Sequence, residues 1–304
     1  MSFPERAGLD PGLDNGGYCP CCRSETRFLV DQAWLRDHYI CTRCRSIPRQ
    51  RHLQTVLDAR FSGWEALRIH ESSPSSDFIG RFAENYTCSQ LIPGVAGGEF
   101  RDGVRCEDVE KLTFPDESID LFITQDVLEH VFDPRGAIKE IHRVLRPGGA
   151  HIFTTPKHPG LIQTVQRARL SNAGTVEPLL EAQYHDSPIG DGRALVTYDY
   201  GHDFESLLST WAGASVVTVN TVDRSRGLDA EFNEVFVIAK PLHYPHHSSQ
   251  KLINRLQGSI DTRDRRIAAL QDAVTELRES TSWRVTAPLR ATTNRVRSLR
   301  KRPS

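Results

Sequence analysis

The segment from Asp120 to Pro156 constrains the fold of this 304-residue chain more than any other. It opens with the apolar run Asp120–Thr124, which is typical of a buried strand. A helix is predicted over Pro134–Leu145, and Pro147-Gly148-Gly149 is expected to form the turn that stops it. A second strand is predicted over Ala150–Thr155. The apolar stripe of the helix consists of Ile138, Ile141, Val144 and Leu145.

The flanking sequence continues the alternation of strands and helices, which predicts an α/β fold with a parallel, doubly wound sheet. Residues 156–200 break this rhythm with scattered Pro and Gly, and we expect a lid or acceptor loop there. The last two strands are expected to pair antiparallel at the sheet edge. The predicted strands are Ala66–His70, Tyr86–Ile92, Val104–Cys106, Ser215–Val219 and Glu234–Lys240, and the predicted helices are Arg49–Phe61, Ser76–Asn85 and Phe204–Ala212.

Four of the seven cysteines form two Cys-x-x-Cys pairs, Cys19/Cys22 and Cys41/Cys44, with 18 residues between the pairs. Each pair offers two sulfurs from one tight turn, and two such turns close a tetrahedron around a metal ion. The spacing therefore predicts a structural Zn²⁺ ribbon over residues 17–48. Four thiolates leave no open coordination position, so we expect no catalytic role for this metal. Cys21 is an alternative to Cys22 as a ligand.

The remaining cysteines, Cys88 and Cys106, are isolated in the sequence and are expected to lie in the core. Residues 1–16, rich in Gly, Pro and Asp, are expected to be disordered. No run of 18 apolar residues and no signal pattern at the start are present, so a cytoplasmic protein is expected.

Several segments of the central part carry a specific resemblance. Phe114-Pro115-Asp116, Asp120–Phe122, Val127–His130 and Arg143–Gly149 resemble the type 11-like class I S-adenosylmethionine-dependent methyltransferases. The resemblance covers roughly residues 64–241 and is strongest over 104–156. It implies a Rossmann-like seven-stranded methyltransferase sheet with S-adenosyl-L-methionine bound across the carboxyl ends of its strands. Cys19–Cys44 followed by Arg49–His52 resembles a subfamily in which a zinc knuckle precedes this fold.

The resemblance also implies a set of cofactor-binding residues. Asp108, followed by Val109, would contact the adenine amino group, and Gln125 and Asp126 would face the cofactor or acceptor after their strand. In the family, the first loop carries Asp/Glu-x-Gly-x-Gly and an acid ends the second strand. This chain instead has Glu71-Ser72-Ser73-Pro74 without glycine, and its second strand ends in Ser89-Gln90-Leu91. Glu71 is expected to bind the methionyl ammonium, Ser72 and Ser73 to replace the glycines, and Gln90 to bind the ribose hydroxyls.

An oxygen acceptor needs a general base near the operating pH. The catalytic candidates are His130 and His185, although Glu129 and His130 would alternatively cap the following helix. Tyr198, Asp199, His202 and Asp203 are further candidates for the acceptor site.

The C-terminal part differs in charge from the rest of the chain. Residues 250–304 hold 13 Lys/Arg and 5 Asp/Glu, against 25 and 34 elsewhere. Residues 250–279 carry a heptad-like pattern that predicts a coiled-coil or amphipathic helix. The segment Ser282–Arg290 resembles a terminal motif of bacterial glycosyltransferases and glycan-modifying methyltransferases. A solvated basic helix is the simpler alternative.

These features divide the chain into a ribbon (17–48), a methyltransferase domain (49–241), a linker (242–249) and a helical tail (250–304). The first functional hypothesis is a methyltransferase acting on a sugar or glycan precursor of surface polysaccharide, or on another small molecule. The second is a non-catalytic binding protein with a degenerate cofactor loop, and the third, less favoured, is an RNA methyltransferase. Partners expected for the tail are the inner membrane face, as a peripheral contact, or a second copy of the chain. Nucleic acid is not an expected partner.

Overall fold

The computed structural model describes residues 14–186, 192–242, 265–267 and 269–276. The chain divides into two compact units, Met1–Leu242 and His243–Ser304. In the second unit, residues 265–267 and 269–276 are helical. The expected motif Ser282–Arg290 lies outside the described residues. No described helix combines the length and apolarity that a membrane crossing requires.

The main sheet has eight strands in the order β16-β17-β9-β8-β4-β5-β7-β6. The five strands from β9 to β7 run parallel, whereas β17 is antiparallel to both β9 and β16. This confirms the α/β, Rossmann-like methyltransferase fold and the antiparallel pair at one edge. The eighth strand, β6, goes beyond the seven expected, because two residues at the other edge pair back antiparallel on β7. The bounds are β4 Arg68–Ser72, β5 Asn85–Gln90, β6 Phe100–Arg101, β7 Val104–Cys106, β8 Ile119–Gln125, β9 Leu145–Thr154, β16 Val216–Val219 and β17 Val235–Ala239.

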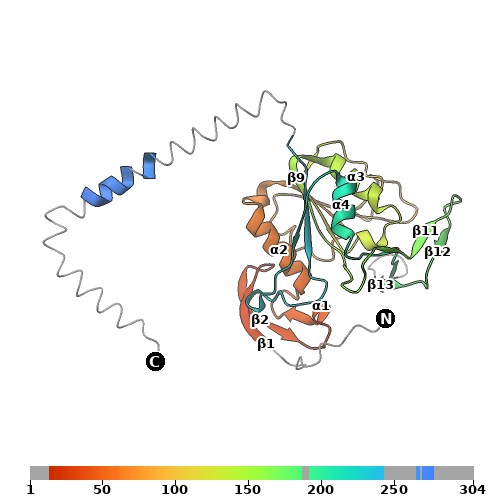
Figure 1. The fold of residues 1–304 in the computed structure, drawn as a ribbon, viewed down its shortest axis with the longest axis horizontal. Coiled ribbons are helices and arrows are strands. Elements are labelled where there is room, and N and C mark those ends of the chain that lie inside the picture. The colour runs from red at the N-terminus through yellow and green to blue at the C-terminus, as the bar shows by residue number, and fades with distance from the viewer. Residues whose placement is uncertain (1–13, 187–191, 243–264, 268, 277–304) are drawn as a thin grey trace. The chain divides into compact units, whose positions relative to one another are not determined.

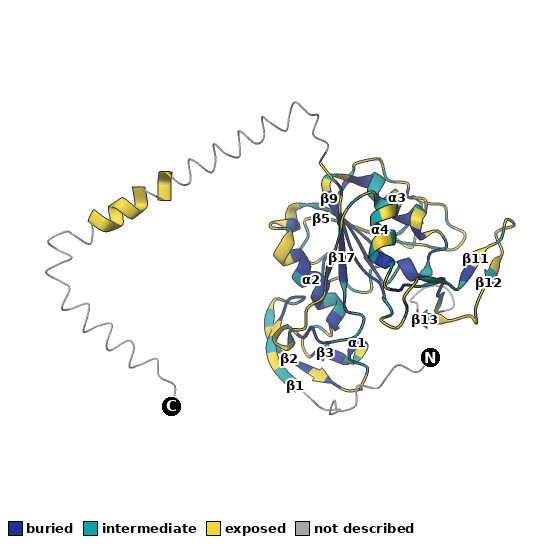
Figure 2. Ribbon diagram, in the orientation of Figure 1, coloured by how far each residue is buried: buried dark blue, intermediate teal, exposed yellow. Residues whose placement is uncertain are grey.

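Helices cover both faces of the main sheet, with α2 (Pro48–Arg60) on one side and α3 (Pro134–Val144) and α4 (Phe204–Ala212) on the other (Figure 1). Alternate residues of each strand point to opposite faces, so the sheet separates two apolar clusters. Phe122 packs with α3 and α4, whereas its neighbours Leu121 and Ile123 pack with α2. Figure 2 shows the buried residues concentrated along the strands and the inner sides of these helices.

The predicted helix over Ser76–Asn85 is wrong, because residues 74–84 form bends and turns. Two neighbouring side chains in this segment pack in different apolar clusters. Phe78 packs with the residues around the paired cysteines, and Ile79 packs with the main sheet. The prediction that Cys88 lies in the core is also wrong. This residue is exposed. It lies on β5, and turns rather than a helix follow that strand. Cys106 is buried as expected.

The expected turn at Pro147-Gly148-Gly149 is instead a bulge inside β9. The helix ends at Val144. Ile119 pairs with Leu145 but Leu121 pairs with Ala150, so β9 has more residues than β8 between these two pairs. Gly148 has a φ of +84°, and a Cβ on Gly149 would lie 2.6 Å from the carbonyl oxygen of Asp120. Both glycines therefore allow the bulge, which increases the local twist of the strand.

The cysteine-bearing module is a three-stranded antiparallel sheet, β1 (Asp14–Cys19), β2 (Ser24–Val30) and β3 (Tyr39–Cys41), with the short helix α1 (Leu35–His38) between β2 and β3. Strand β1 begins inside the stretch expected to be disordered. The module packs closely on η3 (Arg224–Arg226), since a Cβ on Gly17 would lie 2.0 Å from the carbonyl oxygen of Ser225. The boundary at residue 49 between ribbon and methyltransferase domain stays a prediction, because both lie in one compact unit.

Between β9 and α4 the chain forms short two-stranded antiparallel sheets, which we call the arm (residues 156–200). One of them pairs β13 with β14, and another, β11 with β12, extends away from the main sheet (Figure 1). The strands are β10 Val165–Gln166, β11 Ala168–Leu170, β12 Val176–Pro178, β13 Tyr184–Asp186, β14 Arg193–Leu195 and β15 Tyr198–Asp199.

Candidate active site

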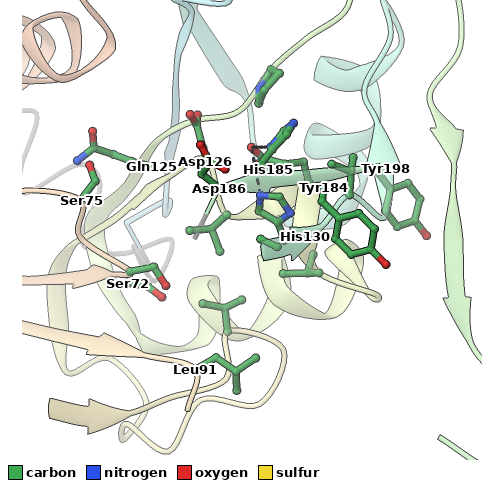
Figure 3. A pocket seen from close by; sticks show the side chains of 18 of the residues that line it. Ser72, Ser75, Leu91, Gln125, Asp126, His130, Tyr184, His185, Asp186 and Tyr198 are labelled. Carbon is green, nitrogen blue, oxygen red and sulfur yellow. Dashed lines mark ion pairs between the residues drawn. The ribbon is translucent and has the colours of Figure 1, made fainter. Parts of the chain in front are cut away.

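A cavity of about 1200 Å³ opens where the parallel strands of the main sheet end. Ser72, Gln90 and Gln125, which end β4, β5 and β8, lie in its wall. The loops that follow these strands, the arm, the cysteine-bearing module and Arg49 of α2 supply further parts of the wall. In Figure 3, Ser72 and Gln125 lie on one side of the cavity and Tyr184 and Tyr198 on the other. Ligands of open α/β sheets bind at this position, outside the carboxyl ends of the strands.

Of the seven residues predicted to bind the cofactor, six line the cavity: Ser72, Gln90, Asp108, Val109, Gln125 and Asp126. Among the described residues, Gln90 Oε1 and Gln125 Oε1 are buried acceptors without a hydrogen-bond partner. An unpaired buried acceptor costs about 1–3 kcal/mol. A ligand that carries hydroxyl and ammonium donors would remove this cost, so these side chains fit the ribose and methionyl parts of S-adenosylmethionine.

Glu71, the seventh predicted residue, does not line the cavity. It is 1% exposed, and its carboxylate accepts hydrogen bonds from Tyr86 Oη and Gln125 Nε2, both at 2.8 Å. Burial raises the pKa of Glu71 to about 7, although both hydrogen bonds act in the opposite direction. In this structure Glu71 orients Gln125, so direct contact of Glu71 with the cofactor stays a prediction.

The loop after β4 keeps a glycine-like backbone without glycine. Ser73 stands where the family has its first glycine, and its φ is +53°. Side chains other than glycine rarely adopt this left-handed conformation. The backbone N–H of Ser73 donates to the carbonyl of Ser89 at 2.8 Å, which ties the loop to the end of β5. The loop therefore has the bend that glycine normally provides.

Asp126 is a charged centre between the main sheet and the cysteine-bearing module. Its carboxylate contacts Arg36 Nη2 at 2.5 Å and Arg49 Nε at 3.1 Å, and it accepts from Thr154 Oγ1 at 2.9 Å. Burial alone would raise the pKa of Asp126, but the two guanidinium groups outweigh it and hold this pKa well below its usual range. Asp126 also has a φ of +53°. Strain of this kind is held in place by the surrounding contacts.

The two predicted catalytic histidines meet in the cavity. His130 follows β8 in η2 (Leu128–His130), His185 lies in β13 of the arm, and their ring centroids are 5.1 Å apart. Glu129 lies beside both, with Oε1 at 3.9 Å from His130 Nε2 and 3.9 Å from His185 Nδ1. Figure 3 shows the rings of His130 and His185 close together. Burial and then the charge of Asp126 raise the pKa of Glu129 to about 8, and burial lowers the pKa of both histidines. At neutral pH both rings are therefore uncharged.

The other acceptor-site candidates separate into two pairs. Tyr198 and Asp199 line the cavity. Asp203 instead accepts from Thr164 N and Oγ1, both at 2.7 Å, and His202 Nε2 lies 3.0 Å from the carbonyl of Pro159. Neither His202 nor Asp203 lines the cavity.

The four predicted zinc ligands, Cys19, Cys22, Cys41 and Cys44, come together with their sulfurs within 4.8 Å of one another. Cys21 is buried but lies outside this group. Cys19 Sγ is 3.7 Å from Cys44 Sγ. Four Zn–S bonds of about 2.3 Å in a tetrahedron place the sulfurs about 3.8 Å apart. The cluster therefore fits a structural Zn²⁺ ion.

A buried guanidinium links the cysteine cluster to the rest of the unit. Arg51 is 0% exposed and donates to the carbonyls of Tyr39 and Gly227, both at 2.7 Å. It also contacts Ser46 Oγ at 3.3 Å, which in turn lies 3.3 Å from Cys19 Sγ. A Zn²⁺ ion with four thiolates carries a net charge of −2, and Arg51 supplies a nearby cation.

Sequence reasoning missed the side chains that the cysteine-bearing module and the following helix bring to the cavity. Trp34, Arg36, Asp37 and Arg49 all line it. The only signal in the sequence is the basic stretch beginning at Arg49, which by itself predicts no more than the start of an amphipathic helix. Nothing local in the sequence connects Arg36 to Asp126, since 90 residues separate them.

Comparison with known proteins supports the interpretation of the central segment. Residues 67–153 match a family model described as a methyltransferase domain. This range contains β4 to β8 and nearly all of β9, and the last residues of β4, β5 and β8 line the cavity. The family match thus covers the part of the sheet on which the predicted cofactor residues lie.

Individual relatives match over shorter lengths. The chain is 38% identical over 56 residues to a probable S-adenosylmethionine-dependent methyltransferase of Mycolicibacterium smegmatis, covering 18% of this chain and 22% of the relative. It is 30% identical over 140 residues to the ubiquinone/menaquinone biosynthesis C-methyltransferase UbiE of Geotalea daltonii, covering 43% and 56%. The chain thus spans from a fifth to about half of the length of these relatives. An S-adenosylmethionine-dependent methyltransferase structure from Mesorhizobium loti aligns with 62% of this chain and 96% of its own, at 16% identity and a TM-score of 0.40.

Proposed function

We propose that this chain, whose residues 67–153 match the methyltransferase domain, is an S-adenosylmethionine-dependent methyltransferase. The observation that carries the proposal is the cavity at the carboxyl ends of the parallel strands. Gln90 and Gln125 line this cavity, and their buried Oε1 atoms have no hydrogen-bond partner among the described residues. Its volume of about 1200 Å³ exceeds the 300–1,000 Å³ typical of a pocket for one small ligand. There is room for a cofactor and an acceptor together.

Bound S-adenosylmethionine would supply a methyl group on a positively charged sulfur. In the proposed site, Gln90 accepts from the ribose hydroxyls, Asp108 from the adenine amino group and Gln125 from the methionyl ammonium. The new bond to the acceptor forms as the carbon–sulfur bond breaks, so these residues act mainly by positioning the reactants, an effect of about 7–11 kcal/mol.

An oxygen acceptor must also lose its proton. His130 Nδ1 lies 2.9 Å from the carbonyl oxygen of Leu195, which can only accept, so Nδ1 carries the hydrogen. The other ring nitrogen, Nε2, then carries no hydrogen and can act as a base, and His130 lines the cavity. We propose that the acceptor binds on this side, next to His130 and His185, and that its proton leaves through this cluster.

The acceptor class that we propose is a sugar or glycan precursor. Support comes from the resemblance of Ser282–Arg290 to the tail motif of glycan-modifying enzymes, and from hydroxyl-bearing and charged groups on the arm side of the cavity, among them Tyr184, Tyr198 and Asp199. Another small-molecule acceptor fits the same cavity. The tail is proposed to contact the inner membrane face or a second chain.

The competing hypothesis, a non-catalytic binding protein, rests on the missing glycines after β4. The left-handed conformation of Ser73 weakens that reasoning, because the loop bends as a glycine-containing loop would.

Titration of the purified full-length protein with S-adenosylhomocysteine by calorimetry tests the proposal. We expect binding at micromolar concentration, and Asp108→Asn should weaken it more than tenfold. The matched control Asp77→Asn changes an exposed carboxylate that pairs with Arg81 outside the cavity, and it should leave the affinity unchanged. Absence of heat and of any thermal shift at millimolar ligand would refute the enzyme hypothesis.

A further inference from the structure

Three potential metal-ligand atoms converge on the acceptor side of the cavity. Glu129, His130 and His185 each offer one ligand atom, and these three atoms lie within 4.8 Å of one another. Glu129 Oε1 is 3.9 Å from His130 Nε2 and 3.9 Å from His185 Nδ1. Glu129 and His130 come from η2, directly after β8, whereas His185 comes from β13 of the arm. The cluster thus exists only because the arm folds back over the end of the sheet.

Two members of the cluster, Glu129 and His130, each make one side-chain hydrogen bond that leaves their other polar atom toward the cluster without a hydrogen-bond partner in the described part of the chain. Glu129 Oε2 accepts from Thr155 Oγ1 at 2.9 Å, and Oε1 is buried without a hydrogen-bond partner among the described residues. The side chain of Glu129 is 2% exposed. His130 Nδ1 donates to the carbonyl of Leu195, so its Nε2 is also an acceptor. Two acceptors that face each other in a buried position are unfavourable unless a cation or a proton lies between them.

The ligand set selects the kind of cation. Two imidazoles and one carboxylate are the ligands of Zn²⁺, Mn²⁺ and Fe²⁺ sites that keep open positions, whereas Mg²⁺ prefers oxygen ligands alone. A metal-bound histidine usually donates its other ring N–H to a carbonyl or carboxylate, as His130 does to Leu195. Metal–ligand bonds of about 2.0–2.2 Å bring tetrahedral ligand atoms to about 3.4 Å. The two separations of 3.9 Å between Glu129 Oε1 and the histidine nitrogens therefore need to shorten only by about half an ångström.

We infer that Glu129, His130 and His185 bind a divalent transition-metal ion in the wall of the cavity. This site is separate from the four-cysteine cluster and differs from it in keeping positions open toward the cavity. Where the proposed methyl transfer holds, the metal would replace His130 Nε2 as the group that promotes proton loss, because one lone pair cannot serve as both ligand and base. An acceptor hydroxyl coordinated there would lose its proton to solvent more readily. The metal site itself does not depend on that function.

Titration with Mn²⁺ of full-length protein that carries one zinc per chain, in the four-cysteine cluster, tests the inference, with the fall of the free Mn²⁺ paramagnetic resonance signal as the readout. Mn²⁺ prefers oxygen and nitrogen ligands, so it should leave the four thiolates occupied by zinc. We expect one Mn²⁺ per chain. Glu129→Gln and His185→Ala should each weaken binding more than tenfold, and the control His202→Ala should not change it.

Titration of the same variants with S-adenosylhomocysteine separates the two proposals. If Glu129→Gln binds S-adenosylhomocysteine with unchanged affinity, this variant is folded. Absence of bound Mn²⁺ in the parent protein, or binding that persists in both variants, would overturn the metal site. Mn²⁺ binding without binding of S-adenosylhomocysteine would leave the metal site standing and count against the methyltransferase.

Discussion

Replacement of Arg36 by methionine tests whether the cysteine-bearing module holds the active site in place. Arg36 Nη2 contacts Asp126 at 2.5 Å, and the two side chains are only 6% and 18% exposed. Arg36 also donates through Nη1 to the backbone carbonyl of Phe232. Methionine keeps most of the length and apolar volume of the side chain but removes the charge and every donor.

Loss of one partner from a buried ion pair costs about 3–5 kcal/mol, because the remaining charge stays buried without compensation. Asp126 would keep Arg49 at 3.1 Å and the hydroxyl of Thr154 at 2.9 Å. We therefore expect a smaller loss, about 2–3 kcal/mol in the free energy of unfolding. For a unit of this size each kcal/mol lowers the melting temperature by about 2–4 °C.

The module offers a matched control in Arg27→Met. Arg27 contacts Asp14 at the same distance of 2.5 Å, but its side chain is 62% exposed. Solvent screens such a pair, so the urea midpoint of this variant should stay close to that of the parent protein. The double variant Arg36→Met/Asp126→Asn removes the stranded charge and should be less unstable than the sum of the single variants. Equal midpoints for Arg36→Met and Arg27→Met, or strict additivity in the double variant, would refute the reasoning.

Three further predictions concern the packing, the buried carboxyl and the metal. Gly17→Ala should lower the melting temperature by several degrees because its Cβ would collide with a backbone carbonyl, whereas Gly16→Ala, with its nearest contact at 4.0 Å, should fold like the parent. Burial raises the pKa of Glu71 from 4.5 to about 7, so the folded state holds a proton that the unfolded state releases. The free energy of unfolding should therefore decrease as the pH rises from about 5 to about 7. A series of urea midpoints against pH checks this, and Glu71→Gln should flatten the curve. Cys41→Ser should lose the zinc measured by plasma mass spectrometry and lower stability, whereas the exposed Cys88→Ser should retain one zinc per chain.

The local pattern of the sequence predicted most of the main sheet and its helices. The apolar periodicity at α3 and α4 reflects how a helix buries one face, a property that neighbouring residues share. The pattern failed at residues 74–84, where apolar spacing resembled a helix although Phe78 and Ile79 pack in different clusters. It failed again at the bulge in β9, because a Pro-Gly-Gly turn signal cannot show that the neighbouring strand continues past it.

Spacing along the chain determined the four-cysteine cluster, since each Cys-x-x-Cys pair is held by its own tight turn. It also predicted which residues follow the strands, and six of the seven expected cofactor residues line the cavity. Only the tertiary structure decided what else surrounds them. The ion pair of Arg36 with Asp126 and the meeting of Glu129 with His185 depend on how the module and the arm pack against the sheet. Such contacts join residues far apart in sequence, and no local periodicity encodes them.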